Sequence, residues 1–205
     1  MTTEVRSAKG AATRDQILDA AAGLMHLQGY HATSLDDVLR ESGVGKGNFY
    51  YYFKSKEDLG YAIIDRVIRG FLERTLEPIF ADPAADPITQ IHAFLDRVRD
   101  NQRRRNCVGG CPMGNLASEL SDVHEGFRLR LAEIFAQWRA RITEALSRGQ
   151  STGRVRRDCD PARAAQFLVA GLEGSILMAK LSKDIAVMEK CVEELKQHLT
   201  LYTVR

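Results

Sequence analysis

Proline, cysteine and net charge are all scarce in this chain of 205 residues. The 5 prolines and few runs of Val, Ile or Thr leave long stretches rich in Ala, Leu, Arg and Glu, which favour helix. Four unevenly spaced cysteines are too few for a disulfide scaffold. A net charge of +2 gives no general attraction to nucleic acid, so any such surface must come from local charge. We therefore expect an all-α fold.

Long hydrophobic segments are also missing from the sequence. No stretch approaches the roughly 18 uninterrupted apolar residues that a membrane-spanning helix needs. Residues 1–12 are mostly polar or small and lack the apolar region of a signal peptide. The sequence therefore predicts a cytoplasmic protein without a membrane partner, with residues 1–12 as a flexible arm.

Apolar residues at helical spacing predict about nine helices in two units. Residues 13–59 form a small three-helix unit, whose first helix begins at Thr13 and ends at Gly29. A long fourth helix, capped by Ser55 and ending near Phe80, leads into a larger bundle that completes residues 60–205. The remaining helices are expected at residues 88–105, 113–121, 123–149, 161–181 and 185–203.

A short helix after Ser34, a glycine-containing turn at residues 43–45 and a second short helix over residues 46–53 form a helix-turn-helix pattern. Phe49 and Phe53 are four residues apart and share the face that packs on the first helix. Five consecutive aromatic residues cannot all face one core, so others must point outward. Residues 43–56 contain three lysines and no carboxylate, which supplies the local positive charge that the whole chain lacks.

The segment 43–59 resembles the signature of TetR-family transcriptional regulators, and Gly29-Tyr30 and Thr33-Ser34-Leu35 fit at the expected offsets. The resemblance implies a homodimeric repressor that binds a palindromic operator through residues 13–59. A ligand bound in the domain of residues 60–205, which also dimerises, would release the DNA. By position, the family contacts bases through Lys46, Gly47, Asn48 and Tyr50. Its phosphate contacts would be Ser34, Tyr51, Tyr52 and Lys56, with Arg14 as a further one.

The segment 103–112 contains three arginines, two glycines and two cysteines. Pro112 suits the first position of a helix, which makes Cys111 its N-cap, and both the helix dipole and the arginines would favour the thiolate. A disulfide between Cys107 and Cys111 is conceivable. Residues 110–122 resemble a subgroup that contains the N-ethylmaleimide-reductase repressor and the acrylate-responsive repressor, which implies electrophile or redox sensing at Cys111. The alternative is a small buried residue that only packs.

The effector cannot be named from the sequence, and no cofactor is expected. Residues that could line a pocket, or simply pack in the bundle, are Phe94, His124, Phe127, Phe135 and Trp138. Cysteine and histidine spacing fits no metal site. Small residues such as Gly171 and Gly174 suit a helix that pairs with a second subunit. An enzyme would need a nucleophile or acid–base set, which we do not find. A helical scaffold or redox-interaction protein that lost DNA binding is the remaining alternative.

Overall fold

The computed structural model describes the backbone of residues 3–204 and the side chains of residues 10–204. Within these residues the regular structure is helical apart from one isolated bridge between Val155 and Thr203, so the predicted all-α fold is confirmed. The helices of the N-terminal part are α1 (Thr3–Gln28), α2 (Leu35–Ser42), α3 (Lys46–Tyr52) and α4 (Lys56–Phe71). A π-helical segment (Leu72–Leu76) and α5 (Glu77–Phe80) follow, and then α6 (Pro87–Arg104), α7 (Pro112–Leu120), α8 (Glu125–Ser151), α9 (Pro161–Ser182) and α10 (Ile185–Thr200).

The first helix is longer than the sequence predicts. Residues 3–12, expected as part of a flexible arm, belong to α1, whereas Met1 and Thr2 lie outside the described residues. Thr13 is therefore an interior residue of the helix and not its N-cap. Apolar spacing carries no signal in this polar stretch, but nothing in it stops a helix that is already anchored by Ile17 and Leu18.

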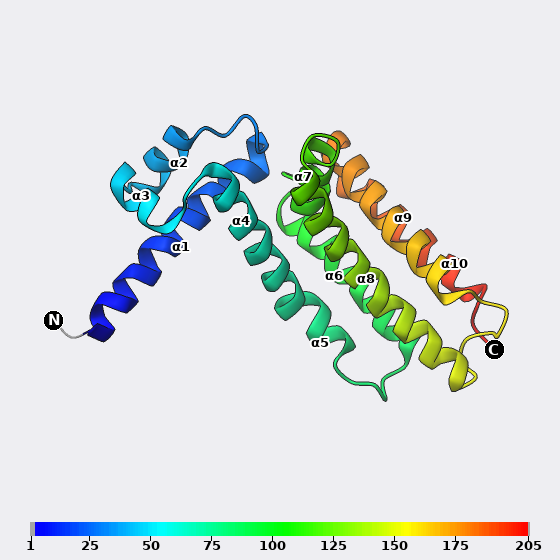
Figure 1. Ribbon diagram of the computed structural model, residues 1–205. Coiled ribbons are helices and arrows are strands. Elements are labelled where there is room, and N and C mark those ends of the chain that lie inside the picture. Colours follow the sequence, from blue (N-terminus) through cyan, green and yellow to red (C-terminus); the bar gives the residue numbers. More distant parts are fainter. Residues whose placement is uncertain (1–2, 205) are drawn as a thin grey trace.

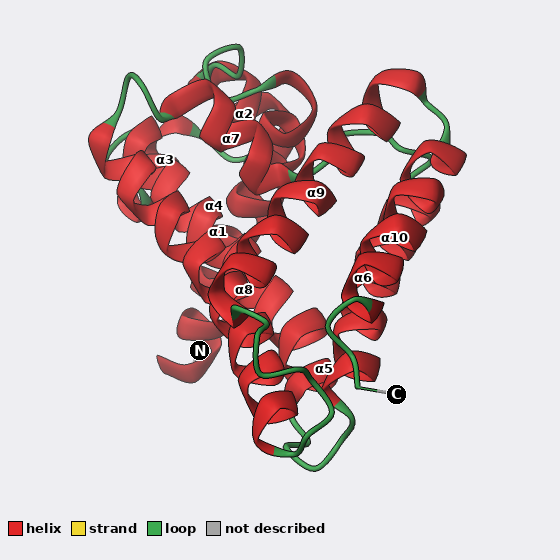
Figure 2. Ribbon diagram, turned by 90° about the vertical axis from the view of Figure 1, so that its right-hand side faces the viewer, coloured by secondary structure: helices red, strands yellow, loops and turns green. Residues whose placement is uncertain are grey.

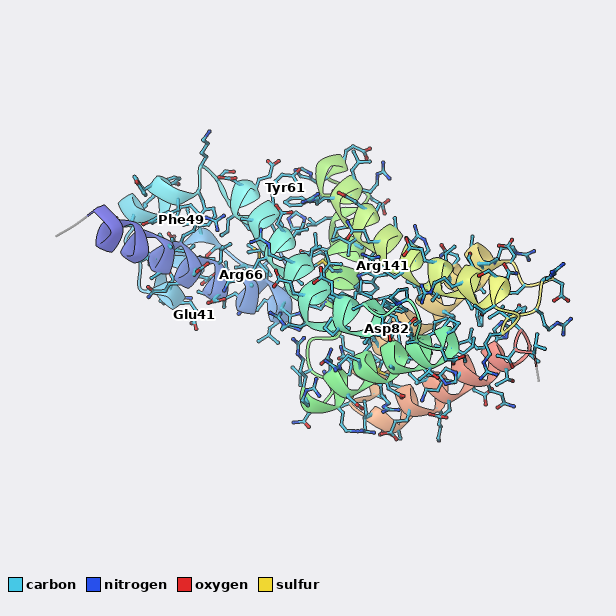
Figure 3. The ribbon with its side chains drawn as sticks, turned by 90° about the horizontal axis from the view of Figure 1, so that it is seen from below. Glu41, Phe49, Tyr61, Arg66, Asp82 and Arg141 are labelled. Atoms are coloured by element: carbon cyan, nitrogen blue, oxygen red, sulfur yellow. The ribbon has the colours of Figure 1, made fainter. Side chains whose placement is uncertain are left out.

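The N-terminal unit packs α1, α2, α3 and the start of α4 around its own apolar core. Phe49 lies inside this unit, and Arg66 of α4 lies beside α1 (Figure 3). The Arg66 guanidinium binds Asp15 and Asp19 of α1, each at 2.6 Å. This unit is therefore held together by buried side chains and by an ion-pair network between α1 and α4.

One long helical rod joins the two units (Figure 1). Helix α4, the π-helical segment and α5 follow one another without a break, so the predicted long helix to Phe80 is confirmed. With this rod taken as one helix, the described residues contain nine helices, as predicted. The π-helical turn follows Phe71, whose ring stacks on Trp138 of α8 at a centroid distance of 4.5 Å.

Helices α6, α8, α9 and α10 form an elongated bundle beside this rod (Figures 1 and 2). Prolines at the first positions of α6, α7 and α9, each preceded by a capping side chain, set where these helices begin. Helix α9 is long and apolar enough to cross a membrane by length and composition. Its packing against α8 and α10 in the bundle accounts for part of that composition, and several of its apolar side chains remain exposed.

Candidate functional site

The helix-turn-helix is built around two buried aromatic rings. Phe49 is fully buried and Phe53 nearly so, with their ring centroids 5.7 Å apart. Gly43 ends α2 in the left-handed conformation (φ 65°), which lets the chain turn sharply into α3. The two rings therefore fix α3 on α1 and α2, as the four-residue spacing predicts.

The rest of α3 faces solvent. Lys46, Gly47 and Asn48 are exposed, and the side chains of Tyr50 and Tyr51 are 49% and 81% exposed. A Cβ added to Gly47 would meet no atom within 4 Å, so another molecule can approach the backbone closely there. The face offers an ammonium group, an amide and two phenols, which are groups that bind DNA bases and phosphates.

Two of the predicted phosphate contacts also have structural roles. Ser34 forms a complete capping box with Asp37: its Oγ accepts from the Asp37 N–H at 3.1 Å, and Asp37 Oδ2 accepts from the Ser34 N–H at 3.0 Å. The Ser34 hydroxyl also donates to Asp37 Oδ2 at 2.6 Å. Tyr52 is half-buried, with its hydroxyl near Gly10 of α1. Both side chains therefore also stabilise the helix-turn-helix.

The two remaining cations lie over aromatic rings. Lys56 Nζ is 4.5 Å from the centroid of the Tyr30 ring and donates to the His31 carbonyl at 3.4 Å. Partial burial lowers the pKa of Lys56, and the nearby Glu119 carboxylate opposes this effect. The Arg14 guanidinium lies 5.2 Å from the Phe53 ring centroid and is exposed. Both cations lie close to the C-terminal end of α3 in sequence or in space.

A cavity of about 310 Å³ lies between α7, α8 and α9. Its polar side chains are the Cys111 thiol, the Asn115 amide, the Ser118 hydroxyl, the Glu173 carboxyl and the Lys180 ammonium group. Lys180 Nζ donates to Asn115 Oδ1 at 3.1 Å, whereas Glu173 Oε1 is buried and has no hydrogen-bond partner among the described residues. The cavity therefore combines an apolar wall with unsatisfied polar capacity, as ligand sites do.

Cys111 caps α7 as predicted, but its predicted acidity is wrong. Its Sγ accepts from the Gly114 N–H at 3.3 Å. Burial and the adjacent Glu173 carboxyl raise the pKa of the Cys111 thiol well above its usual range. None of the three neighbouring arginines is among the groups that shift this pKa. Two of them have other partners: Arg103 binds Glu189 and Arg104 binds Asn101. Cys107 and Cys111 are both free thiols.

The predicted pocket residues separate into one that lines the cavity and four that do not. Phe135 lines this cavity and a second one of about 370 Å³ beside it. Phe94, Phe127 and Trp138 are buried in the core of the bundle. His124 is the N-cap of α8, where Nδ1 accepts from the Phe127 N–H at 3.3 Å. These four residues follow the packing alternative that the sequence left open, since an aromatic residue at helical spacing packs as readily as it lines a cavity.

Several residues of this region were missed from the sequence. Glu173 and Lys180 are single charges within an apolar part of α9, and that contrast was the available signal. Glu119 has no such signal, because its partners are the backbone N–H groups of Tyr30 and His31 at 2.8 and 2.7 Å. No group of three metal-ligating side chains occurs among the described residues.

This fold and this exposed face define a helix-turn-helix transcriptional regulator. The chain belongs to the TetR family. The profile of the tetR family of bacterial regulatory proteins matches residues 17–63, and that of the tetracyclin repressor-like C-terminal domain matches residues 87–195. The family resemblance of the sequence is thereby confirmed.

Individual relatives agree with this assignment. The chain is 34% identical over 184 residues to an uncharacterized HTH-type transcriptional regulator of Lactococcus lactis, covering 90% of this chain and 91% of the relative. It is 33% identical over 162 residues to the transcriptional regulator AcuR of Cereibacter sphaeroides, covering 78% and 74%. The crystal structure of the reduced form of Escherichia coli NemR is similar with a TM-score of 0.82 at 26% identity, covering 91% and 96%. These relatives are regulators and not enzymes, and the last supports the NemR-like subgroup.

Proposed function

We propose that this regulator is a repressor that binds a palindromic operator as a homodimer and leaves it when the α7–α9 cavity is occupied or Cys111 is modified. The observation that carries the proposal is the outward face of α3, fixed by Phe49 and Phe53 and free of carboxylates. Such a protein acts on chromosomal DNA, so we place it in the cytoplasm.

The outward face divides the DNA contacts by chemistry. Lys46, Asn48 and Tyr50 carry donors and acceptors that match base edges in the major groove, and Gly47 lets the backbone approach. The phosphate contacts come from Tyr51, Lys56 and Arg14 on either side of α3 and from the helix start at Ser34. At Ser34 the phosphate contact comes from the start of α2 more than from the hydroxyl, because the hydroxyl already binds Asp37. Tyr52 contributes to DNA binding through its packing, because it is half-buried.

Dimerisation is supported by exposed apolar side chains on α9. Phe167, Leu177, Met178 and Leu181 are all about half exposed or more, with Leu181 at 76%. Gly174 lies among them and has open space around it. Large apolar side chains gathered on one helix mark an interaction surface. A second copy of α9 on this surface would pair the two DNA-binding units, as a two-fold operator requires.

Cys111 gives the cavity a direct route to regulation. Its sulfur is both a wall of the cavity and the cap of α7. Alkylation or oxidation adds bulk at a buried sulfur that accepts from the Gly114 N–H, and this bulk displaces the start of α7. A non-covalent ligand that binds Asn115, Glu173 or Lys180 would act on the same helix.

The test is binding of the reduced chain to DNA from its own upstream region, with salt titrated and N-ethylmaleimide then added. Cys111→Ser is measured in parallel, and Cys191→Ser is the matched control because Cys191 is a half-buried thiol on α10. The proposal expects tight, salt-dependent binding that N-ethylmaleimide abolishes in the wild type and in Cys191→Ser but not in Cys111→Ser. DNA binding that N-ethylmaleimide leaves unchanged in all three proteins overturns the thiol as the signal. If selection from random DNA yields no specific site, the palindromic operator is overturned.

A further inference from the structure

Helix α7 lines the cavity and contacts the N-terminal unit through Glu119. In Figure 1 it lies on the side of the bundle that faces that unit. Its first turn carries Cys111 and Gly114, which line the cavity, and its last turn carries Glu119, which does not. A helix rises about 1.5 Å per residue, so the two ends are separated by about 12 Å. A nine-residue helix is short enough to move as one rigid piece.

Glu119 holds the turn between α1 and α2 with both carboxylate oxygens. Oε2 accepts from the Tyr30 N–H at 2.8 Å, and Oε1 accepts from the His31 N–H at 2.7 Å. Gly29, at φ 95°, adopts a conformation that other residues rarely reach, and an added Cβ there would lie 3.0 Å from Glu119 Oε2. The turn is thus shaped to receive a carboxylate, and hydrogen bonds to a charged group are stronger than neutral ones.

Asn115, one helical turn before Glu119 in α7, binds the loop that packs on the end of α1. It lies four residues before Glu119, so the two side chains share a face of α7. Its Nδ2 donates to the Gly109 carbonyl at 2.7 Å. Gly109 lies directly against the His26 ring, and any Cβ at this position would collide with that ring. His26 belongs to the last turn of α1.

We propose that Glu119 is the positioning residue through which α7 sets the orientation of the DNA-binding unit relative to the bundle. Glu119 binds the turn after α1 directly, and Asn115 fixes Gly109, which packs on His26 of α1. Asn115 also accepts from Lys180 in the cavity. A displacement of α7 at Cys111 therefore reaches the α1–α2 turn without passing through the long α4 rod. This transmission rests on the proposed function of the cavity, whereas the positioning of the unit does not.

The consequence for DNA binding is geometric. In a dimer, the orientation of each DNA-binding unit sets the distance between the two α3 helices, and hence the half-site spacing that is accepted. Glutamine at position 119 has one carbonyl oxygen, so it accepts from one N–H and places its own NH₂ group against the other. Glu119→Gln should loosen the unit and leave its base contacts unchanged.

The experiment measures spacing preference with the full chain. An operator is selected from random duplex DNA with the wild type, and versions with one extra central base pair, which adds about 3.4 Å, are compared. The variants are Glu119→Gln, Glu119→Asp, which keeps both oxygens on a shorter side chain, and the control Glu144→Gln. Glu144 is exposed near the end of α8 and pairs with Arg141. Each variant is also measured after N-ethylmaleimide treatment.

The spacing penalty is the ratio of the affinity for the selected operator to the affinity for the operator with the extra base pair. We expect this ratio to be about tenfold smaller in Glu119→Gln, the factor that corresponds to one lost hydrogen bond to a charged group. Glu119→Asp should fall between Glu119→Gln and the wild type, Glu144→Gln should match the wild type, and N-ethylmaleimide should release less Glu119→Gln from DNA. A Glu119→Gln chain with the full wild-type penalty overturns this inference alone. A wild type without spacing preference overturns the dimeric operator and this inference together. Failure of both Glu119 variants to fold also overturns it, because the residue then serves stability and not orientation.

Discussion

Helices α3 and α7 are both short, with seven and nine residues, yet their contacts come from different distances along the chain. Helix α3 is fixed by Phe49 and Phe53, which pack on helices that are close in sequence, and turns its other side chains to solvent. Helix α7 has partners in the α1–α2 turn and on α8 and α9, including Tyr30 and Lys180. The surface that we propose meets DNA is built from local sequence, whereas the element that we propose responds to the cavity is built from long-range contacts.

This difference explains why one region is a surface and the other a junction. A surface that recognises DNA needs a rigid support and exposed polar groups, and a four-residue spacing of buried rings provides both. A helix at a junction must contact two units at once, so its residues are matched to partners that lie far away in sequence and become neighbours only in the folded chain. Variants of the two helices should therefore separate residues that stabilise the fold from residues that bind DNA or connect the two units.

The largest effect is expected from the buried side of α3. Phe49→Ala should lower the free energy of unfolding by about 3–5 kcal/mol, because it opens a cavity in a closely packed core. Tyr51→Ala, from the exposed side of the same helix, should change stability by less than about 0.5 kcal/mol. Chemical denaturation of the two variants measures this contrast. Equal losses of stability would mean that the two faces of α3 are not divided as described.

Lys56 distinguishes phosphate binding from packing on Tyr30. Lys56→Ala should weaken binding to all DNA sequences together and reduce the slope of log affinity against log salt by about one. Affinities are measured at several salt concentrations for specific and non-specific duplexes. An unchanged slope combined with lower thermal stability would assign Lys56 to packing alone.

The capping box of α2 should contribute a smaller amount. Ser34→Ala removes the acceptor of the Asp37 N–H and should cost about 1 kcal/mol of stability. Ser34→Asp restores an acceptor at the cap but adds a negative charge where DNA phosphates would lie. It should therefore recover stability and bind DNA less tightly than the wild type. Thermal unfolding and DNA titration of the same two samples test both parts.

The acidity of Cys111 gives the smallest and most local prediction. Burial and Glu173 keep this thiol protonated to a higher pH than an ordinary cysteine, since they raise its pKa. Its alkylation by N-ethylmaleimide should therefore be slow at neutral pH and accelerate as pH rises, because the thiolate is the reactive form. Glu173→Gln removes the nearby carboxyl charge and should speed the reaction at a given pH. Identical pH–rate profiles for the two proteins would remove Glu173 as a cause.

The parts of the molecule that the sequence predicts well are those fixed by neighbours along the chain. Ser34, Ser55 and Pro161 begin helices where expected, because capping is a local interaction. The cap formed by Cys111 follows from Pro112 in the same way, but its raised pKa depends on Glu173 from another helix. The extension of α1 to Thr3 and the grip of Glu119 on the α1–α2 turn likewise had no local apolar pattern to reveal them.

The central claim is that the outward face of α3 reads DNA bases, and Asn48 tests it most directly. Binding of the wild type and of Asn48→Ala is measured on the selected operator and on versions with each base pair replaced in turn. The account predicts that Asn48→Ala loses discrimination at one position in each half-site, by about 1–3 kcal/mol, and keeps it elsewhere. A variant that retains the wild-type preference at every position would contradict base reading by α3.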